Sequence, residues 1–104
     1  MGGVEEALRL AFSGEAKAAL RLKVYAERAE EDGYPQIAKL FRVIARSEEI
    51  HGARALRLLR ETKTTEENLA ESFQSERGVA EVAYAEFVRL AEAEGNRAAA
   101  LHFS

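Results

Sequence analysis

The chain has 104 residues, enough for one domain with a modest core. Hydrophobic residues make up 47% and charged residues 32%, a composition that favours helices over a β-rich or disordered chain. The net charge is -3, and Lys and Arg are interleaved with Glu, so there is no basic patch for nucleic acid or an anionic membrane. The absence of cysteine excludes disulfides, thiol nucleophiles, iron–sulfur clusters and cysteine zinc sites.

The first residues, Met-Gly-Gly-Val-Glu-Glu, lack a signal-peptide pattern, and no apolar run is long enough to span a bilayer. We therefore expect a cytoplasmic protein that binds neither a membrane nor nucleic acid.

Turn signals divide the chain into three long helical stretches and a short fourth. The first runs from about Gly3 to Glu31, where apolar residues recur at helical spacing. The turn Asp32–Pro35 ends it, because Gly suits a helix C-terminus and Pro suits the first turn of the next helix. The second stretch then runs from Pro35 to about Glu61.

The third stretch opens with a capping box, Thr64 with Glu67, and continues to about Glu94. After the next turn, Arg97 to Ser104 begins a fourth helix. Because short connections make neighbouring helices antiparallel, we predict an all-α, antiparallel helical bundle that forms a single domain over residues 1–104.

The chain also repeats itself weakly. The parallel segments are Ser13–Glu15 with Gln74–Glu76, Ala29–Gly33 with Ala91–Gly95, and Ala38–Phe41 with Ala100–Phe103. The offset is 61 residues at the glutamates and 62 at the glycines. We interpret the extra residue between Glu76 and Gly95 as a single-turn π-bulge, a feature that is frequent at functional sites.

Glu15, Glu48 and Glu76 fall within apolar stripes, and His51 follows Glu48 by one helical turn. Each glutamate taken alone could be a surface carboxylate paired with Arg. Counted from the turns at about 1.5 Å per residue, however, the four side chains converge on one layer near the middle of the bundle. A metal ion compensates a carboxylate in an apolar stripe, so we predict a metal centre. Carboxylates with one imidazole per metal suit iron or manganese better than a structural zinc.

Three segments carry a resemblance to a rubrerythrin of the ferritin-like superfamily: Ala11–Glu15, Glu31–Ala38 and Ser47–His51. The resemblance implies a ferritin-like bundle with a di-iron centre, in which manganese or zinc could substitute for iron. It implies that Glu15 and His51 are terminal ligands of the first metal, that Glu48 bridges the metals, and that Glu76 is a terminal ligand of the second. It also implies that Tyr84 hydrogen-bonds a ligand carboxylate, the alternative being a plain core aromatic.

The sequence departs from the family pattern at several places. Val79 stands where many rubrerythrins have an additional glutamate tied to peroxidase activity, and Leu22 where a second tyrosine is often found. No Cys-rich rubredoxin module is present, so the resemblance implies an external electron donor such as a rubredoxin-like protein. The fourth-helix ligands would fall after Ser104, and His102 does not replace them because Ala99 stands three residues before it.

We therefore expect a di-iron carboxylate protein that reacts with peroxide or O2 in oxidative-stress defence, as a non-haem peroxidase or oxidase. Val79 leaves open an iron-binding or ferroxidase-like protein without peroxidase turnover, and a non-enzymatic helical bundle lacking a complete metal site is the third interpretation. A short fourth helix would leave an apolar groove, so we expect a homodimer, formed by pairing of two first hairpins or by helix exchange. A shortened chain is the plain alternative.

Overall fold

The computed structural model describes residues 2–78 and 82–104, without the side chains of residues 76–78. Val79, at the expected departure from the family pattern, lies outside the described residues. Glu76 is described only through its backbone, which is helical. The chain divides into two compact units, Met1–Thr62 and Lys63–Ser104.

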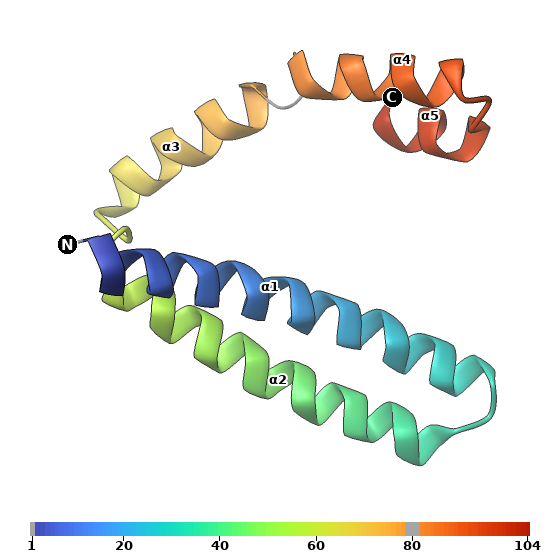
Figure 1. Cartoon of the computed structure of the whole chain (residues 1–104), viewed down its shortest axis with the longest axis horizontal. Helices are drawn as coiled ribbons and strands as arrows, with labels where there is room; N and C mark the ends of the chain where they lie inside the picture. Colours follow the sequence, from blue (N-terminus) through green and yellow to red (C-terminus); the bar gives the residue numbers. More distant parts are fainter. Residues whose placement is uncertain (1, 79–81) are drawn as a thin grey trace. The chain divides into compact units, whose positions relative to one another are not determined.

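The first unit is an antiparallel helix hairpin. Helices α1 (Gly2–Glu31) and α2 (Pro35–Leu58) lie side by side along their length and are joined by a short turn (Figure 1). In this turn Gly33 has a φ of 84°, a left-handed conformation that glycine adopts at little cost. The Tyr34 N–H donates to the Ala29 carbonyl at 2.7 Å and so closes the end of α1. The predicted turn is confirmed.

Helix α2 ends at Leu58, three residues before the predicted end at Glu61. The chain leaves the helix through Arg60, whose φ is 58° and whose N–H donates to the Arg57 carbonyl at 3.0 Å. Sequence gave no signal for this end, because left-handed helix ends are usually marked by Gly or Asn rather than by Arg.

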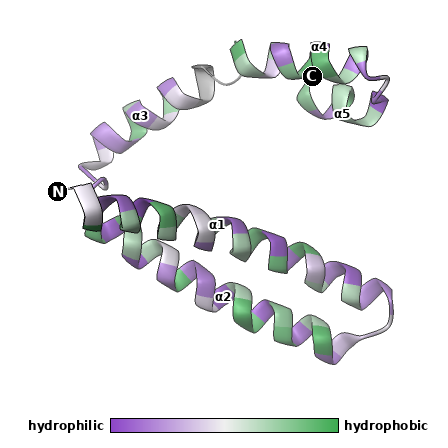
Figure 2. Cartoon of the chain, in the orientation of Figure 1, coloured by the Kyte–Doolittle hydropathy of each residue, from purple (hydrophilic) through white to green (hydrophobic). Residues whose placement is uncertain are grey.

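The interface between α1 and α2 is built from small side chains. Its buried residues are Ala19, Ala26, Ala29, Ala38, Ala45, Gly52 and Ala55. Large apolar side chains lie beside this interface and stay accessible, for example Ile37 at 44% and Ile44 at 38% exposure. Figure 2 shows the apolar residues recurring among polar ones along both helices. Small residues at the contact allow the two helix axes to approach closely.

The second unit contains α3 (Thr65–Gly78), α4 (Tyr84–Ala93) and α5 (Arg97–Phe103). The predicted capping box at the start of α3 is confirmed: the Glu67 N–H donates to Thr64 Oγ1 at 3.1 Å, and the Thr64 N–H donates to Glu67 Oε1 at 3.3 Å. Helices α4 and α5 form a second antiparallel hairpin, with α5 folded back along α4 (Figure 1).

The turn between α4 and α5 repeats the turn of the first hairpin. The Asn96 N–H donates to the Ala91 carbonyl at 2.8 Å, as the Tyr34 N–H does to Ala29. Both residues of the second pair lie 62 positions after those of the first. The predicted internal repeat is therefore present in the structure as well as in the sequence.

The third predicted helical stretch is not one uninterrupted α-helix. Val82 and Ala83 are π-helical and precede α4. They lie between Glu76 and Gly95, where the change of offset predicts one extra residue. A π-helical segment accommodates such a residue, so the predicted π-bulge is confirmed in the described part of this stretch.

All regular structure within residues 2–78 and 82–104 is helical, which confirms the predicted all-α class. None of the helices described there is long and apolar enough to cross a membrane.

Candidate metal centre

Glu15 lies in α1 on the side that contacts α2. The side chain is partly buried, and its Oε2 atom is fully enclosed with no hydrogen-bond donor in reach among the described residues. A buried carboxylate oxygen that lacks both a donor and a cation is costly. A bound cation would compensate this oxygen, which is the reason for which the sequence pattern predicts a metal here.

Gly52 of α2 lies directly across the helix interface from Glu15. A Cβ atom placed on Gly52 would be 3.6 Å from the Cβ atom of Glu15. Gly52 follows His51 in sequence and follows Glu48 by one helical turn. Position 52, next to His51, therefore lies at the height of Glu15, as counting from the turn predicts, and Glu48 lies one helical turn away along α2.

Glu48 and His51 differ in their surroundings. Glu48 is partly buried and lines a groove of about 390 Å³ between α1 and α2, together with Phe12 and Ala16 of α1. His51 is exposed, whereas we expected it in the buried interface. Because successive helix residues are turned by about 100°, Gly52 takes the interface position and His51 lies beside it.

A salt bridge next to this groove was not predicted. The Lys23 ammonium lies 3.2 Å from the Glu49 carboxylate and joins α1 to α2. Lys23 lies 10 residues before Gly33 and Glu49 lies 16 after it, so counting from the turn places them at different heights. Their long side chains bridge this difference. Both residues line the same groove as Glu48. Lys23 is the cationic side chain among the lining residues, and it is already paired with Glu49.

Two ion pairs elsewhere on the first hairpin are solvent-exposed. The Arg42 guanidinium lies 2.7 Å from the Glu30 carboxylate, and this hydrogen bond lowers the pKa of Glu30. The Glu61 carboxylate lies 2.6 Å from Arg9 and raises the pKa of that guanidinium. Exposed pairs of this kind contribute little to stability, and neither involves a predicted ligand.

Tyr84, the first residue of α4, belongs to an aromatic cluster in the second unit. Its ring centroid lies 6.0 Å from that of Phe87 and 5.9 Å from that of Phe103. The side chain is 41% exposed. This packing agrees with the plain aromatic interpretation, while the hydrogen bond to a ligand carboxylate stays a prediction.

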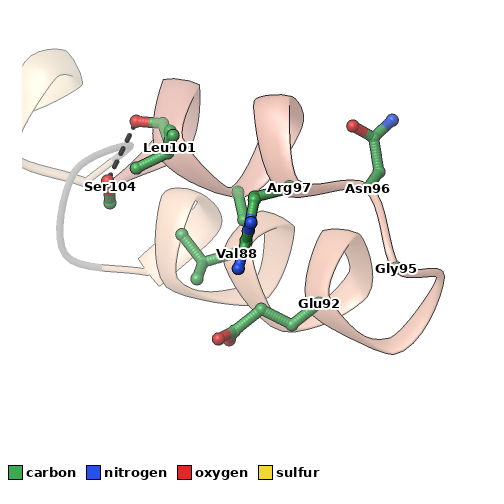
Figure 3. Close-up of a pocket in the computed structure, with 8 residues that line it drawn as sticks. Val88, Glu92, Gly95, Asn96, Arg97, Leu101 and Ser104 are labelled. Carbon is green, nitrogen blue, oxygen red and sulfur yellow. Dashed lines mark hydrogen bonds between the residues drawn. The ribbon is translucent and has the colours of Figure 1, made fainter.

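The second unit also has a hollow of about 480 Å³ between α4 and α5 (Figure 3). Glu92 and Arg97 are its charged lining residues, and Ser104 closes one side by donating to the Leu101 carbonyl at 2.9 Å. None of the predicted ligands whose side chains the structure describes, Glu15, Glu48 and His51, lines it. One carboxylate beside a guanidinium is a poor cation site, so this hollow is not a candidate metal centre.

The residues of the first hairpin fit a hard cation chemically. Glu15 and Glu48 offer carboxylate oxygens, His51 offers an imidazole, and the buried Glu15 oxygen lacks a partner. No group of three or more His, Asp or Glu side chains in the described part of the chain is arranged to hold a metal. The ligand roles of Glu15, Glu48, His51 and Glu76 therefore stay predictions.

Comparison of the sequence with known proteins finds similarity to a family of helical proteins. The rubrerythrin family model matches residues 6–104. Rubrerythrin-2 of Clostridium acetobutylicum is 43% identical over 54 residues, which cover 52% of this chain and 29% of that protein. The aligned region is thus less than a third of the relative's length.

Proposed function

Because this chain belongs to the rubrerythrin family, we propose that it is a di-iron protein that reacts with peroxide or O2 in oxidative-stress defence. Rubrerythrins are di-iron proteins of the ferritin-like class, and family membership supports a protein of that type. The reaction, the metal and the ligands in this chain belong to the proposal.

One observation carries the proposal: the buried Oε2 atom of Glu15 has no partner within the described residues. A protein that used Glu15 only for structure would gain by replacing it with an apolar residue, because removing an unsatisfied buried acceptor relieves its desolvation cost. A bound cation would instead make the buried carboxylate favourable. Glu48 and His51, at the same height on α2, would complete the contribution of this hairpin.

Bound iron would supply electron transfer to peroxide or O2, because it cycles between divalent and trivalent states. The residues of the chain would hold and tune the ion. Glu15 and Glu48 would neutralise its charge, and neutral His51 would bind it through one ring nitrogen. Glu76 of α3 would serve the second metal, and Tyr84 would orient a ligand carboxylate through its hydroxyl. Manganese or zinc could replace iron in the same donor set.

We propose further that the two units are parts of one ferritin-like domain and that the protein acts as a homodimer. The first hairpin exposes large apolar side chains close to its predicted ligands, among them Ile44 at 38%, one helical turn before Glu48, and Ile50 at 45%, next to His51. Exposed apolar surface of this kind favours association. Pairing of two such hairpins, or exchange of helices between protomers, would cover it and add ligands. Electrons would come from a rubredoxin-like donor, because these 104 residues include no cysteine to hold such a centre.

An iron-binding or ferroxidase-like role without peroxidase turnover is the second candidate. It is favoured by Val79, which stands where many rubrerythrins carry the additional glutamate tied to peroxidase activity. The two candidates share the iron centre and differ only in the use of peroxide.

Metal content after anaerobic reconstitution with ferrous iron tests both candidates. We expect about one iron per chain in the wild type, because one hairpin supplies roughly half of a two-metal site. Glu15→Ala should lose most of this iron, whereas Glu6→Gln, an exposed change on the same helix, should keep it. Less than about 0.2 iron per wild-type chain would contradict both candidates and leave a helical bundle without a metal site. Peroxide consumption with an added reductant then separates the peroxidase from the ferroxidase-like protein.

A further inference from the structure

The hollow between α4 and α5 corresponds, through the internal repeat, to an ion pair of the first hairpin. Glu92 and Ser104, which line the hollow, lie 62 residues after Glu30 and Arg42. In the first hairpin these two positions join α1 to α2, because the Arg42 guanidinium lies 2.7 Å from the Glu30 carboxylate. The second hairpin therefore has its hollow on the side where this ion pair crosses between the helices of the first.

Ser104 does not replace Arg42 as a partner for the carboxylate. Its hydroxyl is uncharged and donates to the Leu101 carbonyl at 2.9 Å (Figure 3). Among the side chains that the structure describes, none forms an ion pair with Glu92. The wall of the hollow thus carries a carboxylate whose counterpart in the first hairpin binds a guanidinium.

Arg97 is the other charged residue of the wall, and it has no charged counterpart, because Pro35 stands 62 residues before it. Arg97 begins α5 and Glu92 belongs to α4, and no ion pair joins them in the described part of the chain. Opposite charges on one wall that do not neutralise each other can each bind one end of a ligand that carries both. The planar guanidinium of Arg97 suits a carboxylate, which it can bind through two hydrogen bonds.

The hollow also offers apolar contact between the two charges. Val88 and Ala100 line it and are partly buried, whereas their counterparts Ala26 and Ala38 are fully enclosed in the first hairpin. A short aliphatic chain that links a cation to a carboxylate could lie against these two side chains. The volume of about 480 Å³ lies within the range of small-molecule sites.

We propose that the hollow between α4 and α5 binds a small molecule that carries a guanidinium group and a carboxylate, as arginine does. The guanidinium takes on Glu92 the place that Arg42 takes on Glu30, and the carboxylate binds Arg97. This site does not depend on the metal centre, so it goes beyond the proposed function and is tested on the metal-free protein.

Titration of the full chain with free arginine, followed by amide chemical shifts in NMR spectra, tests the site. We expect a Kd of about 1–10 mM, as suits a small ligand in an open hollow. Glu92→Gln should weaken arginine binding by about tenfold or more, because it removes the charge that the guanidinium binds. Glu30→Gln, the same change at the counterpart position, should leave it unchanged. No binding by the wild type, or equal binding by the two variants, would overturn the inference.

Two analogues of arginine test the two charges in the unaltered protein. Citrulline, in which an uncharged urea group replaces the guanidinium, should bind about tenfold more weakly than arginine or worse. Argininamide, which lacks the carboxylate, should also bind more weakly, and Arg97→Gln should reduce the affinity for arginine without reducing that for argininamide. Citrulline binding as tight as that of arginine would overturn the assignment of the guanidinium to Glu92.

Ser104→Arg tests the correspondence between the two hairpins. The new guanidinium should reach Glu92 as Arg42 reaches Glu30, and arginine binding should then be lost. Arginine binding equal to that of the wild type would contradict the correspondence. Circular dichroism checks that each variant is folded, and the comparison of arginine with citrulline decides the matter for any variant that is not.

Discussion

The rings of Tyr25 and Phe41 pack against each other across the first hairpin, with their centroids 5.8 Å apart. The pair Phe87 and Phe103 lies 62 residues later in the sequence, and its centroids are 5.0 Å apart. Each pair joins two helices next to a turn that is closed by a left-handed glycine. The two hairpins therefore use one local arrangement twice, and the aromatic pair fixes how the helices leave the turn.

Phe41 packs on the buried cluster of Ala26, Ala29 and Ala38, so shortening its side chain should loosen the first hairpin. We expect Phe41→Ala to cost about 2 kcal/mol, less than for a fully buried phenylalanine because the ring is partly exposed. Urea unfolding measures the change. Val43→Ala, at a position that is 61% exposed, should cost much less. Equal losses would show that the aromatic pair does not anchor the hairpin.

Substitutions at Arg60 and Gly33, which flank the two ends of α2, should change the stability of the protein in opposite directions. Arg60 has a φ of 58°, where a side chain is strained, so Arg60→Gly should stabilise the protein by about 0.5–1 kcal/mol. Gly33 has a φ of 84° and open space around its Cβ position, so Gly33→Ala should destabilise it by about 1 kcal/mol through backbone strain alone. Melting temperatures should therefore shift in opposite directions. A shift of the same sign in both variants would contradict the assigned backbone conformations.

The capping box of α3 predicts a pH dependence. Both the hydroxyl and the backbone N–H of Thr64 donate to the Glu67 carboxylate. These hydrogen bonds lower the pKa of Glu67, and the one from the hydroxyl has the larger effect. A lowered pKa in the folded state means that the contribution of Glu67 to stability is present above the ordinary carboxyl pKa. This contribution is lost as the pH falls through the lowered value.

Glu67→Ala should therefore be less stable than the wild type at pH 7, and the difference should shrink in acid as the carboxylate is protonated. Glu66→Ala, in the same helical turn, controls for the general loss of a negative charge near a helix N-terminus. Unfolding monitored by circular dichroism from neutral to strongly acidic pH measures both differences. An identical pH dependence of the two variants would show that the capping box has no specific effect.

Glu15 should reduce the stability of the metal-free protein. Glu15→Met replaces the unpartnered buried carboxylate with an apolar side chain of similar length and should stabilise the apo form by about 1 kcal/mol. The variant should no longer be stabilised when ferrous iron is added, whereas the wild-type melting temperature should rise. Differential scanning fluorimetry under anaerobic conditions gives both quantities. A less stable Glu15→Met apo protein would indicate that Glu15 has a structural partner in solution.

Ile44 and Val43 test the proposed homodimer. Ile44 is 38% exposed on the side of α2 that continues toward His51, whereas Val43 is 61% exposed and turned by about 100° from it. If two first hairpins pair through the surface that carries the predicted ligands, Ile44→Glu should convert dimers into monomers at micromolar concentration. Val43→Glu should leave the dimer intact. Light scattering gives the molar mass, and a monomeric wild type would argue directly against the dimer.

Local sequence signals are sufficient to predict where the helices begin and how they are joined. Gly33, Gly95 and the Thr64–Glu67 capping box act within a few residues, so local rules are sufficient to find them. The height of Glu15 relative to His51 also followed from counting, because two antiparallel helices joined by a short turn have a fixed register. The internal repeat and the change of its offset by one residue were also found from residue spacing alone.

Which side chains enter the interface depends on how the two helices pack against each other. This packing exposes His51, places Gly52 against Glu15 and pairs Lys23 with Glu49. Each of these outcomes depends on the rotation of one helix against the other. Helical periodicity defines an apolar face only to within about one residue, and a rotation of about 100° exchanges His51 for Gly52 at the contact. Small residues allow the two helices to approach closely, and in this hairpin the Oε2 atom of Glu15 is fully buried.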